Sequence, residues 1–255
     1  MRILREPGVY LVGRQTIDAA ELERFLGDHQ VSWETDTEVG AEALCEAAGR
    51  ICYMSFGKGR KTNHDYLHNI IEMQHGSVLE HAVWNFVFTG VSRSLTHELI
   101  RHRAGFGYSQ LSQRYVDESE TDFVEPPCIA DNPELHTVWE ESVRQSLDAY
   151  RRLVDGLART FADEPSATLR RKLARQAARS VLPNATETRI FVTGNARAWR
   201  HFIELRANEH AETEICALAI QVLRVLQVEA PSLFGDYTIE KVAGVEVART
   251  AHRKV

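Results

Sequence analysis

The sequence predicts an α+β fold, and three observations support this prediction. Long stretches carry apolar residues at helical spacing, only a few short stretches have the character of strands, and the two kinds do not follow a regular βαβ order. The chain has 255 residues, of which 44% are apolar, so it can bury a sizeable core without disulfides or structural metals. We expect a single domain over residues 1–255, with a less certain N-terminal segment (1–39) and C-terminal tail (230–255).

Helical patterns dominate the chain after residue 40. The stretch Gly40–Tyr53 is rich in Ala, Glu and Leu, which favour helices, and Asn63 can cap a second helix that ends before Gly76. Pro183 cannot continue a helix, so it ends the helix that precedes it. The remaining predicted helices are one that begins at Ser92 or Ser94, and Leu135–Ala162, Ser166–Val181, Ala196–Leu205 and Ala207–Val228.

Three segments have the character of strands. Aromatic and β-branched residues dominate Ala82–Gly90, and Thr186–Val192 alternates as a strand does. The tail Tyr237–Ala248 is expected to form a terminal hairpin or strand pair. Ala104–Tyr115 contains two glycines and several polar residues, so we predict a loop that ends in a short strand. Prolines at positions 126, 127 and 133 mark another irregular stretch.

Composition and charge argue against several classes of function. The formal net charge is −6, whereas nucleic-acid-binding domains are usually basic. The four cysteines form no C-x-x-C pair or zinc spacing, and most of them lie among apolar neighbours that are typical of a core. No segment resembles a signal peptide or approaches the roughly 18 apolar residues of a membrane span. We therefore expect a cytoplasmic protein with no metal, nucleic acid or membrane partner.

The first candidate site is a cluster of arginines around a loop with two glycines. Arg101, Arg103 and Arg114 bracket Gly105 and Gly107. The guanidinium fork matches paired phosphate oxygens, and glycines let backbone N–H groups approach an anion closely. A single arginine on a helix usually forms a weak surface ion pair, but three arginines around a glycine loop favour a phosphate or nucleotide site. Polar side chains that suit the edges of a heterocyclic ring accompany them, namely Ser109, Gln110, Ser112 and Gln113.

Two further segments carry polar residues that have an ordinary structural explanation. His75 and His81 flank the segment HGSVLEH, but their spacing matches no zinc motif, so a satisfied polar network is the better interpretation of that segment alone. Arg197 and His201 lie four residues apart on one helix face, which by itself is typical of a solvated surface. His102 stands between two arginines, which disfavour its protonated form.

Four separated blocks of the sequence resemble the motifs of the flavin-dependent thymidylate synthases, in the same order. They are HGSVLEH (75–81), VSRSLTHELIRHR (91–103) followed by AGFGYSQLSQRYV, RRKLARQAARSVLPNATETR (170–189) and TGNARAWRHFIELRANEHAETEI (193–215). Together they span most of residues 40–220. The resemblance is specific because four blocks agree in order, where a single short motif would carry little weight.

The resemblance implies an enzyme that methylates dUMP to dTMP. Members of this family bind FAD, take the one-carbon unit from methylenetetrahydrofolate, and use NADPH to reduce the flavin. They are homotetramers whose active sites are shared between subunits, and their fold is a mixed sheet with long helices. They use no cysteine nucleophile, which agrees with Cys128, a loop cysteine with no basic neighbour in sequence.

Carried over motif by motif, the resemblance implies one catalytic residue and two overlapping sets of binding residues. Arg206 would lie at the uracil edge, where a fixed cation lowers the pKa of N3 and makes C5 a better nucleophile. The implied flavin contacts are His75, Ser77, Glu80, Arg101, His102, Arg103, Gln110, Asn195, Arg197 and His201. The implied dUMP contacts are Glu98, Arg101, Gln110, Leu111, Ser112, Gln113, Arg114, Arg179 and Arg206.

The sequence departs from the family pattern between Arg103 and Ser112. Eight residues separate them, where the family has seven. Either the two loop glycines absorb the extra residue as a bulge, or it reshapes the pocket for a different nucleotide or one-carbon donor. Methylation or hydroxymethylation of another uracil nucleotide, UMP, on the same scaffold is therefore the alternative function. A non-catalytic nucleotide- or RNA-binding protein is a second alternative, and the net charge of −6 counts against it.

Overall fold

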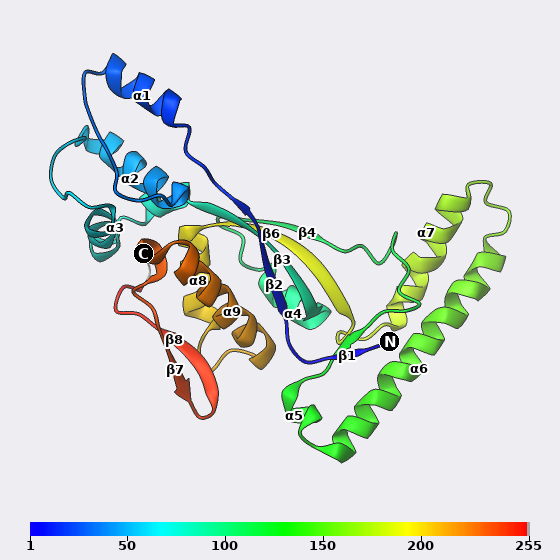
Figure 1. Cartoon of the computed structure of the whole chain (residues 1–255). Coiled ribbons are helices and arrows are strands. Elements are labelled where there is room, and N and C mark those ends of the chain that lie inside the picture. Colours follow the sequence, from blue (N-terminus) through cyan, green and yellow to red (C-terminus); the bar gives the residue numbers. More distant parts are fainter. Residues whose placement is uncertain (254–255) are drawn as a thin grey trace. The chain divides into compact units, whose positions relative to one another are not determined.

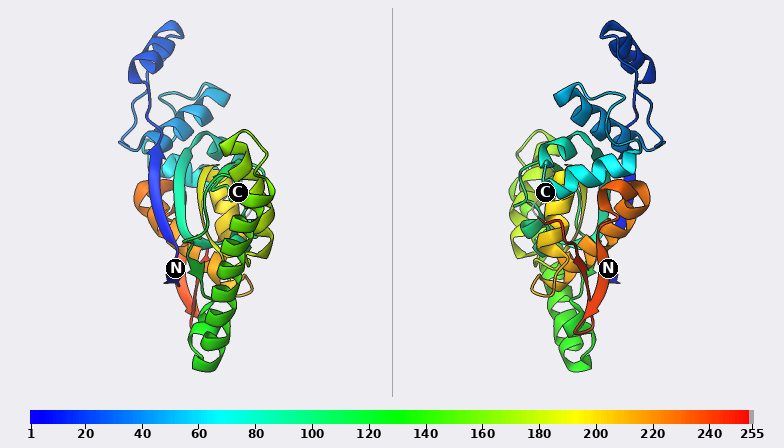
Figure 2. Two further views of the ribbon diagram at one scale, coloured as in Figure 1. Left: turned by 90° about the vertical axis from the view of Figure 1, so that its right-hand side faces the viewer. Right: turned by 90° about the vertical axis from the view of Figure 1, so that its left-hand side faces the viewer.

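The computed structural model describes residues 1–253 and has the predicted α+β character, with helices and strands mixed along the chain (Figures 1 and 2). It divides into two compact units. Unit 1 contains residues 1–8, 88–101 and 109–191, and unit 2 contains residues 9–87, 102–108 and 192 onward. The single domain expected over the whole chain stays a prediction.

A four-stranded sheet supplies residues to both units. Its strands follow the order β2-β3-β6-β4. They are β2 (Gly8–Arg14), β3 (Val83–Ser92), β6 (Glu187–Asn195) and β4 (Phe106–Gln110). Strand β3 buries every second side chain over most of its length, as the predicted strand at Ala82–Gly90 requires, and the strand predicted at Thr186–Val192 is confirmed by β6.

Unit 2 is mainly helical. Its core includes edge-to-face aromatic pairs, with ring centroids 5.1 Å apart for Phe86 and Trp199 and 5.7 Å apart for Trp84 and Phe234. Helices α8 and α9 pack side by side, and strand β8 packs against both (Figure 1). Its elements are α1 (Ala19–Asp28), α2 (Gly40–Tyr53), α3 (Asn63–Glu72), the 3-10 helix η1 (Gly76–His81), α8 (Ala196–Arg206), α9 (Thr213–Glu229), α10 (Pro231–Phe234), β7 (Thr238–Val242) and β8 (Val245–Arg249).

Unit 1 contains the longest helix, α6 (Pro133–Thr160), which packs beside α7 (Ala167–Ala178) (Figure 1). The buried side chains of Phe123, Val143 and Leu147 form a core cluster in this unit. Its other elements are β1 (Ile3–Leu4), which pairs in parallel with β5 (Phe123–Val124), α4 (Arg93–Leu99), α5 (Pro127–Ala130) and the 3-10 helix η2 (Arg179–Val181).

Several predicted elements have the expected bounds, and local chemistry explains why. Helix α2 covers the predicted range Gly40–Tyr53, and the predicted terminal hairpin is present as β7 and β8. Ser92 is confirmed as the N-cap of α4, where its hydroxyl accepts a hydrogen bond from the Leu95 N–H. Ser166 caps α7 in the same way, and the end of the helix predicted there becomes a 3-10 turn before Pro183.

Several predicted boundaries were wrong. Thr62, not Asn63, caps α3, because its hydroxyl reaches the Asp65 N–H. Pro133 begins α6, where its fixed φ and missing N–H are compatible with a first turn. Helix α9 begins at Thr213 and not at Ala207, and β4 stands near the start of the predicted glycine loop and not at its end.

Candidate active site

The expected site residues separate by role between the two units. Most of the expected flavin contacts belong to unit 2, and most of the expected nucleotide contacts belong to unit 1. The unit 2 set is His75, Ser77, Glu80, His102, Arg103, Asn195, Arg197, His201 and Arg206. The unit 1 set is Glu98, Arg101, Gln110, Leu111, Ser112, Gln113, Arg114 and Arg179.

Unit 2 brings three expected flavin contacts to one cavity of about 360 Å³. His75 and Ser77 come from the start of η1, and Arg197 comes from the first turn of α8. Glu80 joins them indirectly, because its Oε1 accepts a hydrogen bond from Arg197 Nη1 at 2.7 Å. Gly49, Cys52 and Tyr53 at the end of α2 complete this side of the cavity, which we call the α2–α8 cavity.

The glycine loop is fixed against the start of α8. Gly105 has a φ of +73°, and a Cβ there would lie 2.8 Å from the Ala198 Cβ and from the Asn195 amide. The Gly105 carbonyl accepts from the Asn195 N–H at 3.1 Å, and the Asn195 side chain caps α8 by accepting from the Ala198 N–H. Only glycine fits this position without strain. The Asn195 amide oxygen therefore has a structural role in addition to the expected flavin contact.

The loop turns sharply between Arg103 and Phe106. The Phe106 N–H donates to the Arg103 carbonyl, and β4 begins at Phe106. Gly107 lies within this strand and has no positive φ, so one glycine, and not both, provides the unusual conformation. Beyond the turn, the Tyr108 hydroxyl donates to the His102 carbonyl at 2.7 Å, which closes the loop on itself.

His102 and Arg206 form a direct pair in unit 2. Arg206 Nε donates to His102 Nε2 at 3.1 Å, so Nε2 carries a lone pair and the imidazole is neutral. His102 is buried, and its ring packs edge-on against Phe202, with ring centroids 5.4 Å apart. His201, from the turn of α8 before Arg206, lies 6.0 Å away between ring centroids. The second half of α8 therefore brings His201 and Arg206 beside His102.

Unit 1 fixes the segment that follows β4. The Gln110 amide donates to the Thr96 hydroxyl at 3.0 Å, and the Leu111 N–H donates to the Arg189 carbonyl at 2.9 Å. The Leu111 carbonyl accepts from Arg93 Nη2 at 2.8 Å. The expected nucleotide contacts from Gln110 onward thus start from a backbone that is hydrogen-bonded to α4 and β6.

Cations gather around this segment. Tyr115 has Lys172 5.0 Å and Arg114 5.8 Å from its ring centroid, and a hydrogen bond to Lys172 lowers the pKa of its hydroxyl. Arg175 donates to the Tyr115 carbonyl at 2.7 Å. Burial lowers the pKa of Arg93, and the charge of nearby Arg179 adds to this effect. The buried Nε–H groups of Arg93 and Arg114 have no hydrogen-bond partner among residues 1–253.

Three of these cations were not assigned a role from the sequence. Arg93 lies in the VSRS block, and its guanidinium contacts the Leu111 carbonyl 18 residues away, a contact that no local pattern shows. Lys172 and Arg175 lie three residues apart, and Arg179 follows four residues later. Lys172, Arg175 and Arg179 therefore share one face of α7 and the turn after it. That helical spacing was the available signal.

The cysteines differ from the expectation that most of them lie in the core. Cys45 and Cys216 are buried, but Cys52 and Cys128 are exposed, and all four are free thiols. Burial raises the pKa of the Cys45 thiol to about 12, so this thiol stays protonated at neutral pH. Residues 1–253 contain no cluster of three or more metal-ligating side chains and no helix long and apolar enough to cross a membrane.

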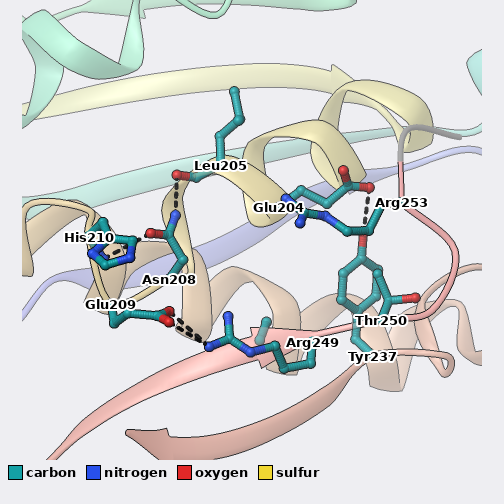
Figure 3. A pocket seen from close by; sticks show the side chains of 10 residues that line it. Glu204, Leu205, Asn208, Glu209, His210, Tyr237, Arg249, Thr250 and Arg253 are labelled. Carbon is teal, nitrogen blue, oxygen red and sulfur yellow. Dashed lines mark hydrogen bonds and ion pairs between the residues drawn. The ribbon is translucent and has the colours of Figure 1, made fainter. Parts of the chain in front are cut away.

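A second cavity of unit 2 contains none of the expected site residues. It measures about 300 Å³ and lies between the loop after α8 and the β7–β8 hairpin (Figure 3). Arg249 lines it and pairs with Glu209 at 2.9 Å and with Glu240 at 3.0 Å. Because these charges satisfy one another, we interpret this cavity as part of the docking of the hairpin.

Comparison with solved structures defines the class of protein first. Two crystal structures of the UMP/dUMP methylase PolB from Streptomyces cacaoi, bound with 5-Br dUMP and with 5-Br UMP, have TM-scores of 0.68 and 0.66 to this chain. They cover 92% of this chain and 96% and 94% of their own chains, at 19% and 20% sequence identity. The chain therefore has the α+β fold of this class of proteins.

Comparison with related sequences then gives the family. A family model described as "Thymidylate synthase complementing protein" matches residues 35–232. Relatives named flavin-dependent thymidylate synthase in Mycobacteroides abscessus and Mycobacterium avium are 55% identical over 228 residues, which is 88% of this chain and 90% of each relative. A relative with this name in Mycobacterium tuberculosis is 54% identical over the same length. The chain belongs to the flavin-dependent thymidylate synthase family and is an enzyme, so the non-catalytic alternative is set aside.

Proposed function

We propose that this protein converts dUMP to dTMP by reductive methylation, with FAD as cofactor, methylenetetrahydrofolate as one-carbon donor and NADPH as reductant. Family membership supports the reaction, and one structural observation supports an anionic nucleotide in unit 1. Arg114 and Lys172 lie 5.8 and 5.0 Å from the Tyr115 ring centroid, and Arg175 donates to the Tyr115 carbonyl at 2.7 Å. Three cations thus gather in one segment of unit 1, and a phosphate group is the anion that guanidinium and ammonium donors suit best.

The α2–α8 cavity is our candidate for part of the flavin site. His75, Ser77 and Arg197 line it with an imidazole, a hydroxyl and a guanidinium, which suit phosphate oxygens and the polar edge of a flavin. When bound, FAD would supply the redox chemistry, which no side chain of the protein can provide. The remaining flavin contacts are proposed from the family motifs alone: Glu80, Arg101, His102, Arg103, Gln110, Asn195 and His201.

Arg206 is the proposed catalytic residue. Its hydrogen bond to the neutral His102 fixes one edge of the guanidinium. A cation held at the uracil edge favours ionisation of N3, and the ionised ring is more nucleophilic at C5. His102 thus has a positioning role toward Arg206 in addition to its proposed flavin contact.

The nucleotide itself is proposed to bind through the segment after β4. Ser112 would contact the substrate as a hydrogen-bonding hydroxyl and not as an attacking group. Its neighbours are held in place because Arg93 binds the Leu111 carbonyl and because Gln110 binds Thr96. The other proposed contacts in this set are Glu98, Arg101, Gln113, Arg114, Arg179 and Arg206.

The identity of the nucleotide is tested by its product. We propose dUMP as substrate. UMP methylation and hydroxymethylation are the alternatives, because the loop that turns at Gly105 is one residue longer than the family pattern. Purified protein is incubated with dUMP and with UMP in parallel, together with FAD, NADPH and methylenetetrahydrofolate. A product heavier than dUMP by one CH2 group supports the proposal. A hydroxymethylated product, or turnover of UMP alone, contradicts it.

We also propose a homotetramer with shared active sites, located in the cytoplasm, with no nucleic-acid or membrane partner. The separation of flavin and nucleotide contacts between two units is compatible with sites completed by a second subunit. The four free thiols are the state that a reducing compartment maintains. Light scattering on the purified protein measures the mass, and a monomer would contradict this assembly.

A further inference from the structure

The segment that joins α2 to α3 has no role in the function proposed above. From Ser55 its sequence is SFGKGRK, which combines two glycines with three cations. Residues 57–61 are all exposed, and Gly57 and Gly59 have φ values of +68° and +77°. We call residues 57–61 the glycine–lysine segment.

One buried side chain organises this segment. Arg50, on the last turn of α2, is 2% exposed, and its Nε lies 2.7 Å from Glu46 Oε1, which balances its charge. Its remaining nitrogens donate to three carbonyl oxygens: Nη1 to Ser55 at 3.0 Å and Lys58 at 2.9 Å, and Nη2 to Arg60 at 2.9 Å. A buried guanidinium therefore turns three peptide carbonyls inward.

Two peptide N–H groups of this segment point away from Arg50. In a trans peptide the C=O and N–H bonds point in opposite directions, and the described residues contain no cis peptide. Because the carbonyls of Lys58 and Arg60 face Arg50, the N–H groups of Gly59 and Lys61 face away from it. Neither N–H has a protein acceptor in the described part of the chain. A Cβ at Gly59 would meet nothing within 4 Å, so an anion can approach closely there.

The charges around the segment are predominantly positive. A cavity of about 360 Å³ lies against it, and Glu34 is the only carboxylate among its described lining residues. Lys58, Arg60 and Lys61 form no ion pair with a carboxylate within residues 1–253. Three cations and two outward N–H groups therefore lie together in a chain whose net charge is −6.

We propose that the glycine–lysine segment binds a phosphate monoester, and that its natural occupant is the 2′-phosphate of the NADPH reductant. The second step rests on the function proposed above. A dianionic phosphate accepts hydrogen bonds from ammonium, guanidinium and backbone N–H donors together, whereas a carboxylate has fewer acceptor positions to use.

The position of the segment supports this occupant. Arg50 lines the cavity of the glycine–lysine segment, while Gly49, Cys52 and Tyr53 line the α2–α8 cavity. Arg50 and Tyr53 are about 4.5 Å apart along the helix axis, so the two cavities lie at the same end of α2. A dinucleotide whose nicotinamide approached the proposed flavin site would therefore direct its 2′-phosphate toward the end of α2 that carries the segment.

The test compares two nucleotides that differ by one phosphate. Calorimetry measures the binding of adenosine 2′,5′-bisphosphate and adenosine 5′-monophosphate to protein saturated with FAD. We expect the bisphosphate to bind more tightly, and the variant Lys58→Gln/Lys61→Gln to weaken its binding by about tenfold or more, or about 1.4 kcal/mol. The variant Arg24→Gln/Lys241→Gln removes the same charge elsewhere on unit 2 and should bind both nucleotides as the natural protein does.

The outcomes separate the two steps of the proposal. Unchanged affinity of Lys58→Gln/Lys61→Gln for the bisphosphate overturns the phosphate site. Equal affinity of the natural protein for both nucleotides overturns the assignment to the 2′-phosphate. Competition by inorganic phosphate that disappears in Lys58→Gln/Lys61→Gln supports the site. Because no turnover is measured, failure here is distinguishable from failure of the proposed methylation, which the product assay measures.

Discussion

At the scale of single residues, Arg206 and His102 share one hydrogen bond at the end of α8. The variant Arg206→Lys keeps the charge but loses the planar fork and the Nε–H that His102 accepts. We expect kcat with dUMP to fall by about 100-fold, or on the order of 3 kcal/mol, while the protein keeps its flavin. Steady-state kinetics and the flavin-to-protein ratio measure the two effects. Activity within a few-fold of the natural enzyme would contradict the catalytic role.

The two loop glycines provide a matched pair of variants. Gly105 has a φ of +73° and no room for a Cβ, whereas the nearest atom to a Cβ at Gly107 is the Thr193 Cβ at 3.8 Å. Gly105→Ala should lower the free energy of unfolding by about 1–3 kcal/mol and weaken FAD binding, because the turn at Arg103–Phe106 must shift. Gly107→Ala should change stability by less than about 1 kcal/mol. Equal effects of the two substitutions in denaturant unfolding would refute this account of the turn.

The sequence alone identified most of the proposed site residues, but it did not show which of them contact one another. The cluster Arg101–Tyr115 was found by residue type and spacing, because three arginines around a glycine loop favour an anion site, whereas the block around Asn195 was assigned only through the family resemblance. The pairing of His102 with Arg206 could not be predicted, since 104 positions separate them and only the fold brings them together. The contact of Arg93 with the Leu111 carbonyl was missed for the same reason.

At the scale of elements, a buried ion pair joins α8 to the segment that leads into the C-terminal hairpin. Arg200 is fully buried, and its Nη1 and Nη2 lie 2.6 and 2.8 Å from the Asp236 carboxylate. The Arg200 guanidinium also lies 4.7 Å from the Tyr237 ring centroid. The same helix ends in Arg206, so this pair supports the position of the proposed catalytic residue.

Replacement of Asp236 tests this support and its pH dependence. Burial opposes the charge of Asp236, but the ion pair with Arg200 and the Thr250 hydroxyl hold its pKa below the ordinary value. Asp236→Asn leaves a buried cation unpaired and should cost about 3–5 kcal/mol at neutral pH. A depressed carboxyl pKa contributes stability above the unfolded-state pKa, and this stability is lost as pH falls through the folded-state pKa. The stability difference between the two proteins should therefore narrow in acid, and a constant difference from pH 7 to acid would contradict the ion pair.

Element prediction succeeded where composition and turn residues determine the structure, and it failed where capping side chains or exposed apolar residues obscure the pattern. Helix α2 and the hairpin of β7 and β8 follow from composition and turn residues. Strand β2 was not predicted, because Tyr10 and Val12 are exposed and its alternation does not separate an apolar from a polar face. Helix α9 begins only at Thr213, because Asn208 and Glu212 form local caps and turns before it.

At the scale of the whole molecule, the proposed contacts are divided between two units, and the proposed tetramer would share its sites. Arg114→Ala affects unit 1 and Arg206→Ala affects unit 2. Each variant alone should be inactive. Mixed oligomers of the two should recover part of the activity, because some sites receive an intact unit 1 and an intact unit 2 from different subunits.

A control mixture makes this result specific. Arg197→Ala and Arg206→Ala both affect unit 2, so oligomers that mix these two variants should stay inactive. Recovery is measured as dTMP formation after co-expression with two different affinity tags, which proves that the oligomers are mixed. Mixed oligomers of Arg114→Ala and Arg206→Ala without recovered activity would contradict shared sites.

The central claim is that this member of the family works through a bound flavin, and an absorption spectrum tests it most directly. The purified protein, alone or after addition of FAD, should show the visible bands of a bound flavin, which belong to the cofactor and not to the protein. Addition of NADPH under anaerobic conditions should bleach these bands, and dUMP with methylenetetrahydrofolate should restore them as dTMP forms. A colourless protein that does not take up FAD would contradict the account.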